Sequence, residues 1–365
     1  MYVPRVIAPS IPFLLALAAC TTHDGDEDSA FDSGSPVGDT GETGETGEPD
    51  ETGETGEVPS IFAPVGHPAA AWFTVPADRG LVWERDPTYA IEEFTVPQMV
   101  VMADGTLRMY ATNMAATEGR WVMESENGVE WGTPTEALLP SAFLPLDCGD
   151  RLEDVAPHYR PGGLDLVAEG SYTPVHTEPA EWRKFCLFEG ADPGPPVPDT
   201  AAFFYEGEAA DNEQISVPSL VSLEDWSARL YYVGNLASPG EGIRVVDVSA
   251  DGAAGASLSD EAVLASTDVD PLPIYLEGGG VRLFHTHGHG GGPGYADSVD
   301  GITFTRDTGL IPHEGEDCTA VGGECLLDPA FLHLPDDRLV LYFTRLEKQA
   351  NGTFTARIER AFATD

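Results

Sequence analysis

The pair Asp328-Pro329 and, ten residues further on, the run Leu339-Val340-Leu341-Tyr342-Phe343 show the pattern that decides the fold. Five segments of the chain share this order: a proline, a short apolar run, a turn with Gly or Asp, and a second run rich in Leu, Tyr and Phe. A repeat of this length indicates an architecture built from similar units. The prolines are Pro97, Pro157, Pro218, Pro271 and Pro329, at intervals of 60, 61, 53 and 58 residues.

A second motif follows the paired runs. It reads Ser125-Glu126-Asn127-Gly128-Val129-Glu130-Trp131 and recurs as Ser298-Val299-Asp300-Gly301-Ile302-Thr303-Phe304. Asn-Gly and Asp-Gly favour tight hairpin turns, so we expect the aromatic residue to begin an outer strand. Each repeat then supplies about four strands. Strands that are apolar on both faces fit sheets packed between neighbouring sheets, which predicts an all-β propeller.

These features resemble the five-bladed β-propeller glycosidases, the arabinanase, invertase and levansucrase group of families 43, 32 and 68. The resemblance covers nearly all of Ser60 to Asp365. It rests on the Asp-Pro strand starts, on Asp-Gly-x-x-x-x-Tyr pairs such as Asp104 to Tyr110, and on the Ser-x-Asp-Gly-x-x-Phe/Trp hairpins. The hairpins also resemble, more weakly, the Asp-box of sialidases. The resemblance implies a five-bladed β-propeller of four-stranded blades.

In that group, three carboxylates on the inner strands of the first three blades surround the mouth of a central channel. One acts as general base, one tunes a pKa and one acts as general acid, because glycoside hydrolysis needs two carboxyl groups across the scissile bond. The corresponding places, next to the strand-start prolines, hold Val96, Ala156 and Val217 in this chain. The family's catalytic register is therefore not kept.

Carboxylates do stand slightly upstream of those places. They suggest a displaced set of Glu93, Asp154 and Glu213, with Glu93 as base and Glu213 as acid. The competing interpretation is that they are solvated loop charges of an acidic protein. Asp270 and Asp328 keep the Asp-Pro form and are candidates for binding, although such aspartates also cap strand starts structurally.

A cluster of histidines and glycines runs from His285 to Gly294 and contains His287 and His289. On a strand, His285 and His287 point to the same side. Neutral imidazoles at alternating positions can bind Zn²⁺, Cu²⁺ or Ni²⁺, so these two are candidate metal ligands and all three histidines are candidates for binding. The alternative is a Gly-rich loop with ordinary surface histidines. A divalent metal is the cofactor that this pattern suggests, and the sequence does not require it.

Two functions are compatible with this sequence. In the first, the propeller engages carbohydrate at the channel mouth and hydrolyses it. In the second, a non-catalytic propeller binds a glycan or a protein partner with the same face.

The N-terminus resembles a bacterial lipoprotein signal. Arg5 is followed by an apolar stretch that is too short to span a bilayer, and the segment ends in Leu17-Ala18-Ala19-Cys20. The sequence therefore predicts a signal peptide over residues 1–19 and lipid attachment at Cys20. The expected location is the bacterial cell envelope, with Thr21 favouring the outer membrane.

Residues 20–59 contain thirteen acidic residues between Thr21 and Pro59 and no Lys or Arg there. Such a segment cannot bury enough apolar surface to fold, so we expect an extended, disordered tether. The folded part is then residues 60–365. The whole chain carries a net charge of −44, which disfavours nucleic acid as a partner. The expected partner is therefore carbohydrate or a surface protein. We expect contact with the membrane only through the lipid.

Four further cysteines form an even set. In an oxidising compartment we expect the disulfides Cys148–Cys186 and Cys318–Cys325, because each would close a short loop, although four cysteines allow three pairings. A metal site formed by His313, Cys318 and Cys325 is the alternative.

Overall fold

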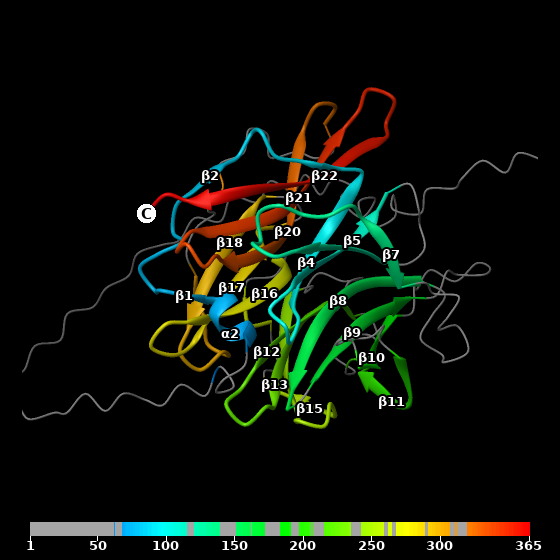
Figure 1. The fold of residues 1–365 in the computed structure, drawn as a ribbon, viewed down its shortest axis with the longest axis vertical. Helices are drawn as coiled ribbons and strands as arrows, with labels where there is room; N and C mark the ends of the chain where they lie inside the picture. Colours follow the sequence, from blue (N-terminus) through cyan, green and yellow to red (C-terminus); the bar gives the residue numbers. More distant parts are fainter. Residues whose placement is uncertain are drawn as a thin grey trace, which may run out of the picture. The chain divides into compact units, whose positions relative to one another are not determined.

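Five β-sheets, antiparallel except for one short parallel pair, make up nearly all of the part of the chain described by the computed structural model (Figure 1). That part comprises residues 62, 68–114, 120–138, 151–161, 163–171, 183–190, 197–205, 207, 215–234, 242–258, 262–264, 268–288, 291–306, 311 and 320–365. Among these residues, no helix combines the length and apolar character that a bilayer crossing requires.

Each sheet is one blade, and four blades consist mainly of consecutive strands. Blades 1 and 2 lie first in the chain: blade 1 contains β4 (Phe94–Val101), β5 (Leu107–Asn113), β6 (Arg120–Ser125) and β7 (Thr135–Leu138), and blade 2 contains β8 (Arg151–Arg160), β9 (Gly163–Ser171), β10 (Arg183–Glu189) and β11 (Val197–Tyr205). Blade 3 contains β12 (Ile215–Ser222), β13 (Ala228–Gly234), β14 (Gly242–Val248) and β15 (Ala254–Ser257), and blade 4 contains β16 (Val269–Leu276), β17 (Val281–Thr286), β18 (Pro293–Ser298) and β19 (Thr305–Arg306). Blade 5 contains β20 (Glu324–His333), β21 (Leu339–Lys348) and β22 (Phe354–Ala363).

The inner strands contact one another in a closed ring, from β4 through β8, β12, β16 and β20 back to β4. Apolar side chains fill the spaces between neighbouring blades, as in the cluster of blades 2 and 3 around Phe185 and Tyr232. The five-bladed propeller predicted from the repeats is thus confirmed. All five predicted pairs of apolar runs are the first two strands of a blade.

Blade 5 takes its outer strand from the N-terminal side of the described chain. Strand β2 (Trp83–Arg85) pairs antiparallel with β22, so that Trp83 lies opposite Ala363; β3 (Ile91–Glu92) also pairs with β22. The Asp365 carboxylate accepts hydrogen bonds from the Gly80 and Leu81 amides, at 3.0 and 2.7 Å. The two ends of the propeller chain therefore close the ring together.

A short segment before β2 covers the ends of the inner strands opposite the prolines. Helix α2 (Pro68–Trp72) leads into β1 (Thr74–Val75), which pairs parallel with β16 at Tyr275 and Leu276. Phe73 packs against the apolar clusters of several blades. The Thr74 carbonyl lies 2.8 Å from Nδ1 of His333 at the end of β20. This segment caps one end of the channel.

The Ser-x-Asn/Asp-Gly motifs form turns, but the two copies differ in where the outer strand begins. Strand β7 starts four residues after Trp131, whereas β19 starts at Thr305, directly after Phe304. The turns are held by side chains: the Gly128 amide donates to Ser125 Oγ at 2.9 Å. Trp131 packs edge-on against Tyr342 of blade 5 at 6.0 Å. That contact buries more apolar surface than a place in an exposed outer strand would, so the aromatic residue belongs to the core between blades.

The second copy of the turn repeats this arrangement. The Gly301 amide donates to Ser298 Oγ at 2.8 Å, and Phe304 packs edge-on against Tyr231 of blade 3 at 6.1 Å. The Tyr231 hydroxyl donates to the Gly301 carbonyl at 2.7 Å, as the Tyr342 hydroxyl does to the Gly128 carbonyl at 2.6 Å. Both turns thus attach one blade to the second strand of the preceding blade.

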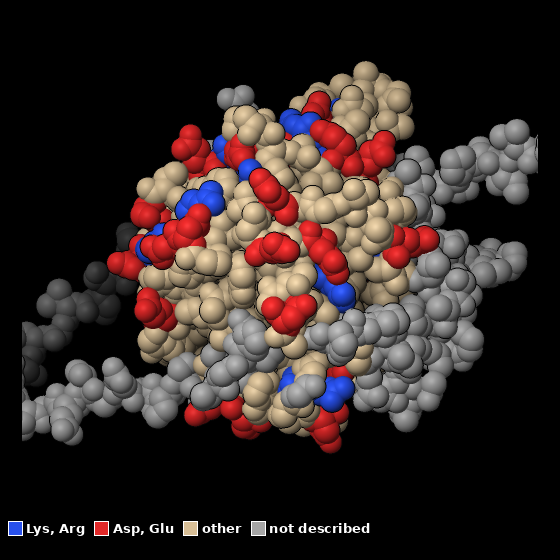
Figure 2. Space-filling view, viewed as in Figure 1, with Lys and Arg blue, Asp and Glu red and all other residues tan. Residues whose placement is uncertain are grey.

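Acidic side chains are scattered over the visible face of the propeller, with fewer basic ones among them (Figure 2). Several arginines are held in ion pairs. Arg85 on β2 contacts Glu324 at 2.9 Å and Glu359 at 2.6 Å, and Arg345 also contacts both glutamates. The basic charge of blade 5 is therefore largely neutralised within the blade.

The predicted disulfides fall partly outside the described residues. Cys186 on β10 and Cys325 on β20 are buried. Cys148 and Cys318, their predicted partners, lie outside the described ranges. The two pairings therefore stay predictions, and so do the signal peptide, the lipidated Cys20 and the tether.

Ring closure can be tested at Trp83, which is 3% exposed and packs against Phe284 of blade 4 and Phe331 of blade 5. We expect Trp83→Ala to lower the free energy of unfolding by about 3–5 kcal/mol, because it opens a cavity between two blades. Urea unfolding monitored by circular dichroism measures this loss. The adjacent Val82→Ala is the control, since Val82 is exposed. A loss of less than about 1 kcal/mol for Trp83→Ala would contradict this role.

Candidate functional site

Four inner strands carry a strained residue directly before the repeat proline. Val96, Val217, Asp270 and Asp328 have φ between 52° and 56°, a left-handed conformation that is a clear outlier for a β-branched residue. Each lies at a break in the register between the first two strands of its blade. Strain of this kind costs about 1–3 kcal/mol per residue and concentrates at functional sites. The strained residues surround one end of the channel.

Blade 2 differs from the other four. Its register shifts between Leu152 and Val155, so the bulge contains Glu153 and Asp154 and not Ala156 and Pro157. Alignment of the five prolines would place Ala156 level with the bulge residues of the other blades, but in this strand the irregularity comes three residues before the proline. Asp154 is therefore brought to the level of the strained residues in the other blades.

Side chains from the preceding blade satisfy several amides in or next to these bulges. Thr344 Oγ1 on β21 accepts from the Val96 amide at 2.7 Å, and Glu169 Oε2 on β9 accepts from the Val217 amide at 2.7 Å. Asp270 Oδ2 accepts from the Asp328 amide at 3.3 Å.

The same pattern links blades 1 and 2. Gln98 Oε1 accepts from the Val155 amide at 2.7 Å. Buried donors need partners, so these polar side chains link four of the five pairs of neighbouring blades around the channel.

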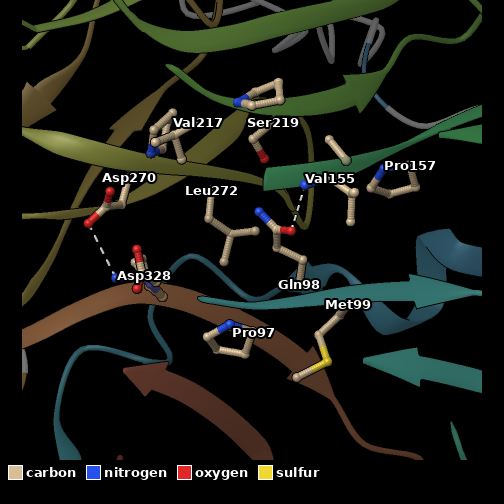
Figure 3. Close-up of a pocket in the computed structure, with 14 residues that line it drawn as sticks. Pro97, Gln98, Met99, Val155, Pro157, Val217, Ser219, Asp270, Leu272 and Asp328 are labelled. Carbon is tan, nitrogen blue, oxygen red and sulfur yellow. Dashed lines mark hydrogen bonds between the residues drawn. The ribbon is translucent and has the colours of Figure 1, made fainter. Parts of the chain in front are cut away.

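A pocket opens at this end of the channel, and all five inner strands line it (Figure 3). The five repeat prolines form much of its wall. Asp270 and Asp328 are the carboxylates among its lining residues, and Figure 3 shows Asp270 directed toward Asp328. The other lining residues are Gln98, Met99, Val155, Ala156, Val217, Ser219 and Leu272.

The two aspartates have different surroundings. Asp270 Oδ2 accepts hydrogen bonds from Thr286 Oγ1 at 2.6 Å and from the Asp328 amide. Burial raises the pKa of Asp328 well above its ordinary value, and the negative charges of Asp270 and Asp154 raise it further, against a hydrogen bond with Thr344 and the charge of Arg120. Carboxyl groups in unlike environments are the usual basis of an acid and base pair.

Arg120 places a cation behind these carboxylates. It is 1% exposed, and its Nη2 lies 3.3 Å from Asp154 Oδ1, which also accepts from Gln98 Nε2 at 3.1 Å. The Nε and Nη1 atoms of Arg120 are buried without a hydrogen-bond partner. Because such donors are rarely left unsatisfied, Arg120 has hydrogen-bonding capacity that a bound water or ligand group can use.

Some of the predicted site residues lie at the pocket and others do not. Asp270 and Asp328 line the pocket, and Asp154 lies behind it. Glu93 is exposed and does not line the pocket; its amide and carbonyl bond to Ala356 and Met114. Glu213 lies outside the described residues. The catalytic roles assigned to Glu93, Asp154 and Glu213 stay predictions.

The histidine cluster lies beside the pocket. Val269 at the start of β16 pairs with Thr286 at the end of β17, so His285 and His287 flank the residue that holds Asp270. Both histidines lie next to Asp268, which the sequence did not single out. His289 lies outside the described residues.

Sequence reasoning also missed Arg120, Gln98 and Thr344. Only Gln98 lies next to a repeat proline, so a scan of each proline's neighbours could have found it. Arg120 begins the third strand of blade 1 and Thr344 lies in the second strand of blade 5. Nothing in the local sequence marks either as facing the channel.

Solved structures of glycoside hydrolases share this architecture. A thermostable family-43 glycoside hydrolase aligns with a TM-score of 0.56 and 17% identity, over 76% of this chain and 92% of that chain. A xylan β-1,4-xylosidase from Bacillus halodurans aligns with a TM-score of 0.53 and 13% identity, over 76% and 54% of the two chains. An endo-1,4-β-xylanase from Bacteroides thetaiotaomicron gives 0.50 and 15%, over 73% and 94%. The chain has the five-bladed fold of family 43.

At this level of identity the likeness establishes the fold alone. No family model matches the sequence. No curated protein matches it either.

The raised pKa of Asp328 predicts a pH-dependent loss of stability. A carboxyl whose pKa is higher in the folded state stabilises fully below the unfolded value of about 3.9, and this contribution is lost as pH rises through the folded pKa. Asp328→Asn removes the loss. We therefore expect the melting temperature of the variant minus that of wild type to increase between pH 4 and pH 8. The increase should be about 2–4 °C for each kcal/mol of unfolding free energy that wild type loses when Asp328 ionises.

Calorimetry at several pH values measures this difference. Asp336→Asn is the control, because Asp336 is exposed and the pKa of its carboxyl is lowered, first by a hydrogen bond from Arg338. A difference between Asp328→Asn and wild type that does not change with pH would show that Asp328 titrates normally.

Proposed function

We propose that the protein is a carbohydrate-active propeller that hydrolyses glycosidic bonds in the pocket at the channel mouth. The observation that carries this proposal is the pair of aspartates in the pocket, of which Asp328 has a raised pKa and Asp270 is held as a hydrogen-bond acceptor by Thr286. The fold shared with family 43 supports it.

In this mechanism Asp328 acts as the general acid. Its raised pKa keeps the carboxyl protonated to a higher pH than that of an ordinary aspartate, so it can donate a proton to the leaving oxygen of the glycosidic bond. Asp270, the second carboxylate, takes a proton from a water molecule whose oxygen bonds to the anomeric carbon as the glycosidic C–O bond breaks. Asp154, paired with Arg120, contributes negative charge that sustains the raised pKa of Asp328.

The pocket wall suits the flat, weakly polar faces of sugar rings. Five prolines together with Met99 and Leu272 provide apolar surface, and Gln98 and Ser219 provide polar groups. The capped far end of the channel leaves the mouth as the entrance. The neighbours that are named for xylan make pentose-containing glycans the first class to test.

Substitution of the acid tests the proposal. We expect wild-type protein to cleave at least one member of a panel of aryl β-xylosides, aryl α-arabinofuranosides and xylan oligosaccharides. Asp328→Asn should lower the rate on that substrate by about 10²–10⁴-fold, the usual contribution of general acid catalysis. Asp336→Asn, at an exposed turn, should leave the rate unchanged. Equal rates for Asp328→Asn and wild type would refute the role of Asp328.

A non-catalytic propeller that binds a glycan or a surface protein with the same face is the second candidate. The absence of the family's register at Val96 and Val217 favours it. It would be supported if wild type bound a glycan of the panel, with no cleavage, and if this binding were lost when Gln98 was replaced by Leu.

We also propose that the propeller is anchored to the bacterial cell envelope through a lipid on Cys20, with residues 20–59 as a tether. The sequence pattern that ends at Cys20 supports this. The export that it implies would also allow the Cys148–Cys186 and Cys318–Cys325 disulfides to form.

Lipidation has a direct readout. When the chain is expressed in a bacterium fed a labelled fatty acid, we expect label on the wild-type protein and its recovery with membranes. Cys20→Ser should lose both, whereas Cys186→Ser should retain the label. A wild-type protein that is released without label would rule out the anchor.

A further inference from the structure

Three side chains beside the channel mouth offer ligand atoms to a common point. Asp268 directly precedes β16, His285 lies in β17, and His287 follows the end of β17. Their ligand atoms all lie within 4.8 Å of one another. His285 Nε2 is 3.8 Å from Asp268 Oδ2, and His287 Nδ1 is 3.0 Å from Asp268 Oδ1. We propose that these three residues bind a divalent transition-metal ion.

The spacing fits such an ion. Zinc binds nitrogen and carboxylate oxygen at about 2.0–2.2 Å, which places tetrahedral ligand atoms roughly 3.3–3.6 Å apart. The two histidine-to-aspartate distances lie on either side of this range. Small side-chain rotations therefore bring the three ligand atoms around one ion without moving the strands.

The pairing of β16 with β17 explains why the three residues meet. Because Val269 lies opposite Thr286, Asp268 falls beside the two residues that flank Thr286. Side chains alternate along a strand, so Thr286 is directed to Asp270 in the pocket while His285 reaches Asp268. One short pair of strands thus supplies both a pocket carboxylate and the metal ligands.

The surroundings of His285 orient it as a ligand. The Leu283 carbonyl lies 3.4 Å from its Nδ1, which favours the tautomer with the proton on Nδ1 and a lone pair on Nε2, the atom that faces Asp268. Second contacts of this kind are typical of metal-binding histidines. Both Asp268 and His285 are buried, at 0% and 1% exposure. A buried carboxylate against two imidazoles is stabilised by a cation.

Glycines allow the backbone to approach the two histidines closely. A Cβ at Gly294 would lie 3.0 Å from His285 Nε2, and a Cβ at Gly291 would lie 2.3 Å from the His287 carbonyl. The Gly288 amide also approaches Asp268 Oδ1 at 3.4 Å. The side chain of His287 remains half-exposed. The ion can therefore enter from solvent, and coordination positions remain for water.

Two imidazoles and one carboxylate select the class of metal. This donor set suits Zn²⁺, Co²⁺, Ni²⁺ or Fe²⁺, whereas Ca²⁺ and Mg²⁺ prefer oxygen ligands alone. None of the three ligands lines the pocket, so the proposed metal site is separate from the pocket that contains Asp270 and Asp328.

Cobalt titration of the intact chain without an affinity tag tests the proposal. We expect one equivalent of Co²⁺ to bind per chain with visible absorption, and Zn²⁺ to displace it. His287→Ala should weaken Co²⁺ binding about tenfold or more. Because His287 is half-exposed, this variant should keep the wild-type melting temperature in the presence of a chelator. Asp268→Asn should weaken binding likewise.

His333→Ala is the matched control. His333 also lies beside an aspartate, 3.1 Å from Asp337, but outside this site, so its loss should leave Co²⁺ affinity unchanged. Equal affinity for wild type and His287→Ala would overturn the proposal, as would complete displacement of Co²⁺ by millimolar Ca²⁺. The absence of stoichiometric Co²⁺ binding by the folded wild type would overturn it as well.

Discussion

The arrangement of this propeller depends on backbone amides beside the channel that do not bond to the next strand of their own sheet. A side chain of a neighbouring blade accepts their hydrogen bonds instead. Val96 and Val217 hold a backbone conformation that valine avoids, and a side chain from the preceding blade accepts the hydrogen bond of each amide. An unsatisfied buried amide would add a cost comparable to that of the strain. The acceptors Thr344 and Glu169 therefore act as interblade ties and not only as polar lining of the channel.

The same constraint determines the chemistry at the mouth. Asp270 accepts the amide of Asp328, which brings one carboxylate close to another that is poorly solvated. The raised pKa of Asp328 follows from this backbone requirement together with Asp154. If only apolar side chains stood at the channel mouth, the Asp328 amide would lack its hydrogen-bond acceptor. If all the carboxyl groups there were ionised, their negative charges would repel one another. The structural acceptor and the titrating group are therefore neighbours by necessity.

Much of the fold was predictable from the sequence, because the repeat prolines and the paired apolar runs are local signals. The five inner strands and their partners follow from them directly. Strand β2 was not predicted, since nothing near Trp83 indicates that it pairs with Ala363 at the other end of the chain. Asp154 illustrates a second limit: alignment by proline places Ala156 in the bulge, and only the register of blade 2 shows otherwise. Contacts such as that between Arg120 and Asp154 join different blades, and single-sequence patterns carry no information on such pairs.

The shared construction of blade 5 has a consequence for how the molecule reaches its native state. Strand β2 and its partner β22 lie at opposite ends of the folded chain, so their pairing carries a large loop-closure entropy. Blades 1 to 4 can form from local hairpins, but the ring closes only when the last residues, with the Asp365 clamp on Gly80 and Leu81, are present. Until then an apolar blade face stays uncovered. A chain that has not yet been synthesised as far as Asp365 therefore stays open, and the slow, non-local step of folding comes after all five blades have been made.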